Sequence, residues 1–546
     1  MGLVSDSVAY TRFAVGLRRF LREIPTPAQA EEIVRRRLTE RKENFLLVAE
    51  KAVYGYAKSP YLTLLREARC ELGDLRNAVR RKGLETALRD LREAGVYITF
   101  EEFKGRKPIR RFGKTWPVAQ KDFDNPFLRR YFYGRTSGTT GPGTRFPVDL
   151  ETIAARQPMR LLARIAQGIH NVPVAIWRGV PPTNMVGVKN ILGNAKLGNV
   201  PLKWFTPITF DDRPSWKHRL YVEGIVRLGR LHGVPFPYPE TVRLDEAVVI
   251  ARWLEEMVRA HGKCYLSTFG SMSLRVAVAA LDEGIDLTGA VLSLGGEPPT
   301  EAKASAVRRS GARPLGNYNI SELGGVGKAC MNPIGENDQH FMKDRLALIQ
   351  HPRLAPGTEI EVPALLFTTI VPEMNKIFLN VETDDYGTVE TRSCGCPFEG
   401  YGLTEHIRDI RSFRKLAGEG MTLVGSEMER ILEEVLPARF GGTPLDYQLV
   451  EREDEQGFTR LLLMVHPRLS IENEAEVVET MLTALGKSSK LAGGAATIWR
   501  QAKAIRVHRE PPVTTGAGKL LPLRLERREP GSSLPAGRVP DRVSRG

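Results

Sequence analysis

Apolar residues recur along the chain at two spacings, and each spacing predicts a different kind of element. From residue 8 to about residue 100 they fall three or four positions apart among many Arg and Glu residues, most clearly over 28–48 and 84–94. That spacing places them on one side of a helix. The first hundred residues are therefore predicted to be helical, and the Gly- and Pro-rich stretch 101–125 is typical of an irregular connector.

From residue 147 to about residue 408, stretches with helical spacing alternate with short apolar runs. The helical stretches are 244–261, 271–284 and 300–310, and the apolar runs are 172–177, 290–294 and 365–370. This alternation predicts an α/β domain with a largely parallel sheet, whose ligands bind at the ends of the strands.

A second unit begins near Arg411. Helical spacing at 427–436 and 472–485, and strand patterns at 447–452 and 460–466, predict a small α+β unit. The last stretch, 527–546, is rich in Pro, Gly, Ser and Arg, a composition typical of disorder. We therefore expect four regions, at 1–125, 126–410, 411–526 and 527–546.

Composition narrows the class of protein. At 546 residues with 42% hydrophobic residues, the chain is long enough for two or more packed domains. Its net charge of +15 favours phosphate-bearing or other anionic partners. Because the charge is spread along the whole chain, we expect no nucleic-acid partner. No apolar run approaches the roughly 18 residues of a transmembrane segment. The N-terminus lacks a signal-peptide pattern and the five cysteines are an odd number, so we expect a cytoplasmic protein.

Glycine and hydroxyl residues are concentrated in the stretch 133–145. Its centre reads Thr136, Ser137, Gly138, Thr139, Thr140, Gly141. Glycines let several backbone N–H groups converge and the hydroxyls add further donors, which predicts an anion-binding loop. The phosphate-loop NTPase pattern is excluded, because it requires a lysine that this stretch lacks. A flexible surface turn is the alternative.

Four later segments follow this loop in order. They are Gly296-Glu297-Pro298, Asn317-Tyr318-Asn319-Ile320-Ser321-Glu322, the stretch 382–387 that contains Asp385, and the stretch 511–519 that ends at Lys519. With the loop, they resemble the motifs of the adenylate-forming enzymes, the acyl-CoA synthetase and luciferase superfamily. The resemblance implies a large α/β domain of the adenylate-forming type at 126–410 and a mobile α+β lid domain at 411–526.

The resemblance also implies a nucleotide site. The loop would wrap the phosphates of ATP, the segment at 296–298 would line the adenine pocket, Tyr318 would stack on adenine, and Asp385 would accept hydrogen bonds from the ribose hydroxyls. The expected nucleotide-binding residues are Thr136, Ser137, Gly138, Thr139, Thr140, Gly141, Gly296, Glu297, Pro298, Asn317, Tyr318, Asn319, Asp385 and, at the hinge, Arg411.

Three residues would carry the chemistry in such an enzyme. Ser321 would contact a phosphate and Glu322 would hold Mg²⁺, a hard cation that suits a carboxylate together with phosphate oxygens. Lys519 would bridge the substrate carboxylate and the α-phosphate and stabilise charge as pyrophosphate leaves.

The sequence departs from the family pattern in three places. Asn319 replaces a glycine, and Asn tolerates positive φ, so the expected turn can survive. Asp384 stands where glycine or a basic residue is common, and a second carboxylate beside a nucleotide is unfavourable unless it points outward. The acidic residue usual at the hinge is missing.

Within the superfamily the chain resembles the phenylacetate-CoA ligase-like branch. The branch carries a Cys and a His after the Mg²⁺ motif and a Cys-x-Cys later, which correspond here to Cys330, His340, Cys394 and Cys396. Three thiolates and one imidazole suit a tetrahedral Zn²⁺. Unligated reduced thiols with a surface histidine are the alternative.

The resemblance implies ATP-dependent activation of a carboxylic acid to an acyl-AMP, followed by acyl transfer to CoA. An amine or a carrier-protein thiol is an alternative acceptor, and a catalytically inactive nucleotide-binding scaffold is a non-enzymatic alternative. Acyl transfer through a cysteine nucleophile would have to use Cys264, whose setting is typical of a buried strand. Whether the protein is a monomer or a homodimer is left open.

Overall fold

The computed structural model describes residues 3–128, 132–135, 145–180, 185–207, 216–297, 299–354, 361–412, 416–418, 421–423, 428, 430–453, 459–488, 490–513 and 523–525. The stretch 527–546, for which the sequence predicts disorder, lies outside these residues.

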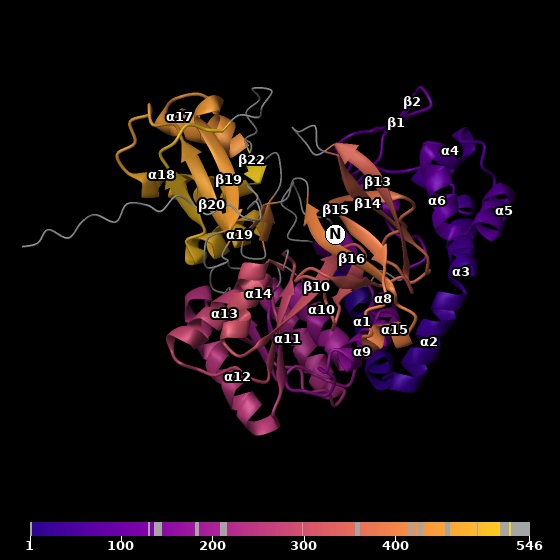
Figure 1. The fold of residues 1–546 in the computed structure, drawn as a ribbon, viewed down its shortest axis with the longest axis horizontal. Helices are drawn as coiled ribbons and strands as arrows, with labels where there is room; N and C mark the ends of the chain where they lie inside the picture. The colour runs from indigo at the N-terminus through magenta and orange to yellow at the C-terminus, as the bar shows by residue number, and fades with distance from the viewer. Residues whose placement is uncertain are drawn as a thin grey trace, which may run out of the picture.

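The body of the molecule is built on one twelve-stranded sheet (Figure 1). The strand order is β13-β14-β15-β16-β12-β11-β10-β9-β8-β5-β6-β7. The strands are β5 (Val174–Trp177), β6 (Lys203–Thr206), β7 (Pro239–Thr241), β8 (Cys264–Ser267), β9 (Ala290–Gly295), β10 (Arg313–Ile320), β11 (Gly324–Ala329), β12 (Gln339–Phe341), β13 (Leu346–Leu354), β14 (Glu361–Thr369), β15 (Val381–Thr391) and β16 (Glu405–Ser412).

From β7 to β10 neighbouring strands are parallel. Every residue of β5, β8 and β9 is buried, as expected for parallel strands that are covered on both faces. This double burial is the reason why these strands appear in the sequence as short apolar runs. The helices of this half are α8 (Leu150–Ala155), α9 (Gln157–Ala166), α10 (Val186–Ala195), α11 (Trp216–Leu231), α12 (Ala247–His261), α13 (Gly270–Asp282) and α14 (Glu301–Arg309).

From β10 to β13 the neighbours are antiparallel. The expectation of a largely parallel sheet is therefore wrong for this half, and the sheet as a whole is mixed. The reason lies in strands such as β15, which buries a run of polar side chains over 382–385 and so lacks the apolar pattern of a strand.

The N-terminal helices form part of the body. Leu88, Ile98 and Phe103 lie in the same hydrophobic core as β13 to β15, and Ile98 forms a β-bridge with Val381. Figure 1 shows α2 to α6 along one edge of the molecule. The helices are α1 (Leu3–Arg22), α2 (Pro27–Thr39), α3 (Arg41–Val48), α4 (Pro60–Glu67), α5 (Leu72–Lys82), α6 (Leu84–Glu93) and α7 (Phe100–Phe103).

The C-terminal part contains a separate four-stranded sheet with the order β21-β20-β19-β22. Figure 1 shows this unit, in orange and yellow, at one corner of the body. Its apolar residues continue the core around α12 and α13, and Gln501 Nε2 donates to the carbonyl of Pro207 over 3.4 Å. Its elements are α17 (Leu436–Phe440), β19 (Tyr447–Glu453), β20 (Thr459–Val465), α18 (Glu474–Ser488), α19 (Lys490–Ala502), β21 (Ile505–His508) and β22 (Leu523–Leu525).

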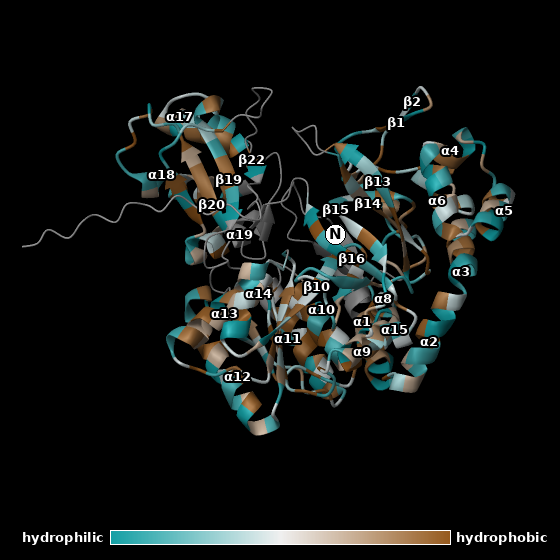
Figure 2. Ribbon diagram, in the orientation of Figure 1, coloured by the Kyte–Doolittle hydropathy of each residue, from teal (hydrophilic) through white to brown (hydrophobic). Residues whose placement is uncertain are grey.

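Short elements complete the described chain. They are the strand pairs β1 (Ile109–Arg111) with β2 (Lys114–Trp116), β3 (Phe132–Arg135) with β4 (Arg145–Val148), and β17 (Leu416–Gly418) with β18 (Met421–Leu423), the π-helical turns η1 (Ala49–Tyr54) and η4 (Ile431–Val435), the 3-10 helices η2 (Gln120–Phe123), η3 (Leu244–Glu246) and η5 (Pro444–Asp446), and α15 (Pro397–Gly400). Figure 2 shows hydrophilic residues interleaved with hydrophobic ones along the helices. None of the described helices is long and apolar enough to cross a membrane.

Candidate functional site

Two residues expected to bind the nucleotide, Tyr318 and Asp385, are in contact near the end of β10. The Tyr318 hydroxyl donates to Asp385 Oδ2 over 2.8 Å, and the Ser412 hydroxyl donates to the other carboxylate oxygen. Arg411 precedes Ser412 on β16, the strand that pairs with β15, and is exposed. Burial, and after it the Asp385 carboxylate, raises the pKa of Tyr318 well above its usual range, so the phenol stays protonated and donates.

The expected Mg²⁺ carboxylate has a cationic partner that sequence reasoning missed. Lys104 Nζ lies 3.1 Å from Glu322 Oε1, and both side chains are largely buried. Lys104 follows α7 and lies over the rings of Phe100 and Phe103. Burial alone would raise the pKa of Glu322, but the Lys104 ammonium outweighs it and lowers that pKa to about 2. No sequence signal links the two residues, because they are far apart in the chain. Ser321, beside Glu322, is exposed.

Glu297 is held inside the protein. Lys303 Nζ donates to its Oε2 over 3.0 Å and the Ser271 hydroxyl donates to its Oε1 over 2.6 Å. The carboxylate therefore joins the starts of α13 and α14, and it is Gly296, with φ 80°, that turns the chain after β9. A side chain at Gly296 would collide with the ring of Phe269.

The two departures beside the nucleotide residues differ from expectation. Asn319 lies within β10, next to a shift in strand register, and it is not among the residues with positive φ. Asp384 has φ 67° instead, and its side chain is 1% exposed, so it does not point outward. Asn317 pairs with Gly295 of β9, and its side-chain oxygen accepts a hydrogen bond from Lys328 Nζ over 2.9 Å.

Several expected site residues lie outside the described part of the chain. They are Thr136, Ser137, Gly138, Thr139, Thr140, Gly141, Pro298 and Lys519. The described strands β3 and β4 flank the stretch 136–144 as an antiparallel pair.

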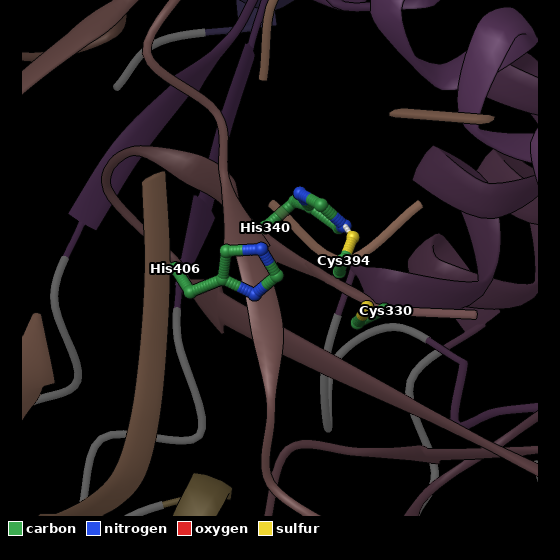
Figure 3. A group of neighbouring side chains, drawn as sticks. All are labelled: Cys330, His340, Cys394 and His406. Atoms are coloured by element: carbon green, nitrogen blue, oxygen red, sulfur yellow. Dashed lines mark hydrogen bonds between the residues drawn. The ribbon is translucent and has the colours of Figure 1, made fainter. Parts of the chain in front are cut away.

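The cysteine and histidine residues gather at one point. Their ligand atoms come from β11 to β12, from β16 and from the loop before α15. His340 Nε2 lies 3.0 Å from Cys396 Sγ and 3.6 Å from Cys394 Sγ. Figure 3 shows the His340 ring directed at the sulfur of Cys394, with Cys330 and His406 beside them. The structure thus brings all four expected residues together, and it adds His406, which sequence reasoning missed although it follows the Cys-x-Cys by ten positions.

Both imidazoles have the orientation of metal ligands. His340 Nδ1 lies 2.8 Å from the carbonyl of Leu403, which can only accept, so this nitrogen carries the proton and Nε2 is bare. His406 Nδ1 lies 2.7 Å from Asp338 Oδ1, and its buried Nε2 has no hydrogen-bond partner. Ligating histidines commonly hold their second nitrogen in this way.

The fourth ligand is either His406 Nε2 or Cys396 Sγ. Cys330, His340, Cys394 and His406 have ligand atoms all within 4.8 Å of one another, whereas Cys396 makes the shortest contact to His340. Two thiolates with two imidazoles, or three thiolates with one, both suit tetrahedral Zn²⁺. We favour the set with His406, because its Nε2 is otherwise left without a partner.

Cys264 does not fit a nucleophile. It is fully buried on β8, and burial raises the pKa of its thiol to about 12. A thiol at that pKa is almost entirely protonated at neutral pH, and the thiolate is the reactive form.

No family model and no curated protein sequence matches the chain. Solved structures do match. 2-Hydroxyisobutyryl-CoA ligase, in complex with 2-HIB-AMP and CoA in the thioesterification state, is 14% identical, with 92% of this chain and 91% of that chain covered and a TM-score of 0.51. An amide bond synthetase from Marinactinospora thermotolerans is 12% identical over 92% of this chain and 97% of that one, with a TM-score of 0.40.

A Brucella canis acyl-CoA synthetase is 16% identical over 75% of this chain and 65% of that one, with a TM-score of 0.31. At these identities the comparison concerns the fold. The chain has the fold of 2-hydroxyisobutyryl-CoA ligase, an α/β body with a smaller α+β unit, and the sequence predicted both parts.

Proposed function

We propose that this protein activates a carboxylic acid with ATP to form an acyl-AMP and then transfers the acyl group, most favourably to CoA. The observation that carries the proposal is the contact between Tyr318 of β10 and Asp385 of β15, with the buried Glu322 just after the end of β10, where an α/β sheet presents its ligand site. Tyr318 and Asp385 lie far apart in the chain, and each of the three residues has the chemistry that one part of MgATP needs.

The residues present fit a nucleotide with its cation. Asp385 offers carboxylate oxygens to ribose hydroxyls, Arg411 is exposed beside it, and Glu322 is ionised and would hold Mg²⁺. A bound Mg²⁺ would offset phosphate charge. The protein supplies orientation and charge stabilisation and needs no covalent nucleophile.

The remaining roles are part of the same proposal. The loop Thr136 to Gly141 would bind the phosphates, Lys519 would stabilise the charge that develops during adenylation, and 411–526 would act as a lid that moves between the two half-reactions. We further place the protein in the phenylacetate-CoA ligase-like branch. Its support is the Tyr-x-x-Ser-Glu-Leu-Gly sequence and the gathered cysteines.

Exchange of labelled pyrophosphate into ATP tests the first half-reaction. Aryl, aliphatic and amino acids should be screened one by one, with Asp385→Asn as the variant weakened in ATP binding and Cys70→Ser, outside the site, as the control. Acid-dependent exchange supports the proposal. Binding of ATP without exchange for any acid would favour the alternative of a catalytically inactive scaffold. The buried side chain of Asp384 supports that alternative, because a second carboxylate beside a nucleotide is unfavourable.

We also propose that the cysteine and histidine group holds one structural Zn²⁺. Cys330, Cys394 and His340 would supply three ligands and His406 the fourth, with Cys396 as the alternative. In both histidines Nε2 is the ring nitrogen without a proton, and this supports the donor set. Metal analysis of protein purified without added zinc tests it, and a content near zero would leave reduced, unligated thiols.

A further inference from the structure

Five basic residues, two of them buried and three half-buried, lie close together in the body, and no role proposed above uses them. Arg156, Arg160 and Arg164 follow one another at intervals of four along α9 and its N-cap, so they share one helix face. Lys328 of β11 and Arg345, which precedes β13, complete the group. We call these five residues the basic cluster.

The cluster is packed in place. The guanidinium of Arg156 lies over Gly324 and that of Arg160 over Gly193, so that a Cβ at either glycine would collide with it. Arg164 donates to the side-chain oxygen of Asn194 and lies 5.7 Å from the centre of the Tyr265 ring. These contacts fix where the positive charges sit.

Within the described chain, the cluster lacks the carboxylates that would balance it. Asp344 is its one ion-pair partner there, 3.6 Å from Arg345 Nε, and that carboxylate is shared with Arg37 at 3.7 Å. Among the described residues, Nη1 of Arg164, a residue only 3% exposed, has no hydrogen-bond partner, and neither do Nε and Nη2 of Arg156.

Such a group is unfavourable without an anion. Burial, followed by the charges of Arg160, Arg164 and Arg345, lowers the pKa of Lys328 to about 7. Burial and then Arg345 lower the pKa of Arg156 to about 9. Buried cations that are not paired destabilise a fold, and strongly perturbed groups of this kind cluster at functional sites.

The cluster lies at the reaction site. Lys328 Nζ donates to Asn317 Oδ1 over 2.9 Å, and the next residue, Tyr318, donates to Asp385. Lys189 of α10 interacts electrostatically with both Arg156 and Glu322. The cluster thus contacts the strand position before Tyr318, whose side chain faces the other side of the sheet, and Lys189 links it to Glu322.

We propose that the basic cluster selects the acid: it binds a second anionic group, a carboxylate or a phosphoryl group, that the substrate carries away from the carboxyl group to be activated. The inference rests on the proposed acid activation and names its substrate class. The guanidinium groups of arginine and the ammonium group of lysine suit both a carboxylate and a phosphoryl group. An acid whose aryl or alkyl part carries no charge would leave the cluster without its anion.

The test is calorimetric titration of the full chain, without ATP, with three matched acids of equal length. They are α,ω-dicarboxylates, ω-phosphonocarboxylates, and the monomethyl esters of the dicarboxylates, which keep one carboxylate and are uncharged at the other end. The dicarboxylate or the phosphonate should bind more tightly than the ester by roughly 10- to 100-fold, the range for one hydrogen bond between charged groups. Preference between the two distinguishes carboxylate from phosphoryl.

Lys328→Met should reduce the affinity for the preferred dianion to about that of the ester. Arg160→Gln, the second variant, should do the same if Lys328→Met does not fold. Arg313→Gln removes a partly buried arginine of β10 outside the cluster and should keep wild-type affinity. Equal binding of dianion and ester, binding of neither dianion, or no effect of either cluster variant would overturn the inference.

Pyrophosphate exchange separates this inference from the proposed function. A dianion that binds through the cluster but supports no exchange contradicts acid activation and leaves the cluster as an anion site. Exchange with neutral acids alone, at rates that Lys328→Met does not change, supports activation and refutes the selection. If Lys328→Met instead raises the KM for ATP equally with every acid, the cluster serves the nucleotide phosphates and the inference is wrong.

Discussion

At the scale of single residues, Lys104 and Glu322 form the pair with the clearest energetic consequence. The pKa of Glu322 is about 2, below the ordinary 4.5, so its ionisation stabilises the fold above pH 4.5, and this contribution is lost as pH falls towards 2. A depression of that size is worth about 3 kcal/mol. Lys104→Gln should lower the free energy of unfolding by roughly that amount at pH 7.

Urea unfolding of both proteins at pH 7 and pH 3.5 measures the difference. It should shrink at the lower pH, because wild type then begins to lose the same contribution. Lys104→Arg keeps the charge and should stay close to wild type. A difference that is unchanged by pH would mean that Lys104 acts by packing on Phe100 and Phe103 instead.

Asp385 and Tyr318 contribute unequally to the proposed nucleotide site. Asp385→Asn removes the charge expected to face the ribose hydroxyls, and we expect the KM for ATP to rise roughly 10- to 100-fold, as for loss of a hydrogen bond to a charged group. Tyr318→Phe removes one donor to Asp385 while Ser412 remains, so its effect should be several-fold smaller. Steady-state kinetics of both variants measure the two changes in the KM for ATP. The reverse order would show that the phenol binds the nucleotide directly.

The sequence predicted these nucleotide residues because their order along the chain is family-specific, and the structure brings Tyr318 and Asp385 into contact. It could not predict Lys104, because a lysine after a short helix has no pattern that points to a carboxylate more than two hundred residues away. The turn expected at Asn319 is instead a strand position, since β10 continues through it.

At the scale of elements, the proposed metal ligands connect β11, β12 and β16 with the loop before α15. Because a metal that binds the folded state alone stabilises it, Cys394→Ser should lower both zinc content and melting temperature, with less effect on activity per folded molecule. His406→Gln and Cys396→Ser should differ in zinc content, and the variant that loses zinc identifies the fourth ligand. Cys70→Ser, outside the group, is the control. Atomic absorption and thermal unfolding provide both readouts, and full zinc content in Cys394→Ser would exclude the site.

The sequence predicted best the strands that are buried on both faces and the helices with a clear apolar side. The apolar run 290–294 corresponds to β9, and the helical spacing of 244–261 to η3 and α12. Strands that carry ligand residues break this pattern. β15 buries Glu382 and Asp385 among its polar residues, so its sequence shows no alternation, although a strand is what holds Asp385 opposite Ser412.

At the scale of the whole molecule, the proposed lid would bring Lys519 to the reaction centre for one half-reaction only. Lys519→Ala should therefore reduce acid-dependent pyrophosphate exchange by roughly 10² or more, as for loss of a charge-stabilising group. Transfer from a supplied acyl-AMP should be much less affected. The two rates can be measured separately in the same variant, with Lys503→Ala as a control in the same unit. Near-normal exchange would remove Lys519 from the mechanism.

The acceptor is decided by the second half-reaction, in which the C-terminal unit presents a different surface to the acyl-AMP. A net charge of +15 favours an anionic acceptor such as CoA, or an acidic carrier protein, over a cationic amine. With a competent acid, CoA should accelerate AMP release and yield a thioester, and the acceleration should weaken at high salt, because exposed charges are then screened. AMP release is followed with CoA, a carrier protein or an amine as the single acceptor. CoA is not the acceptor if it neither accelerates AMP release nor forms a thioester while a carrier protein or an amine accepts the acyl group. That result would leave the proposed adenylation unchanged.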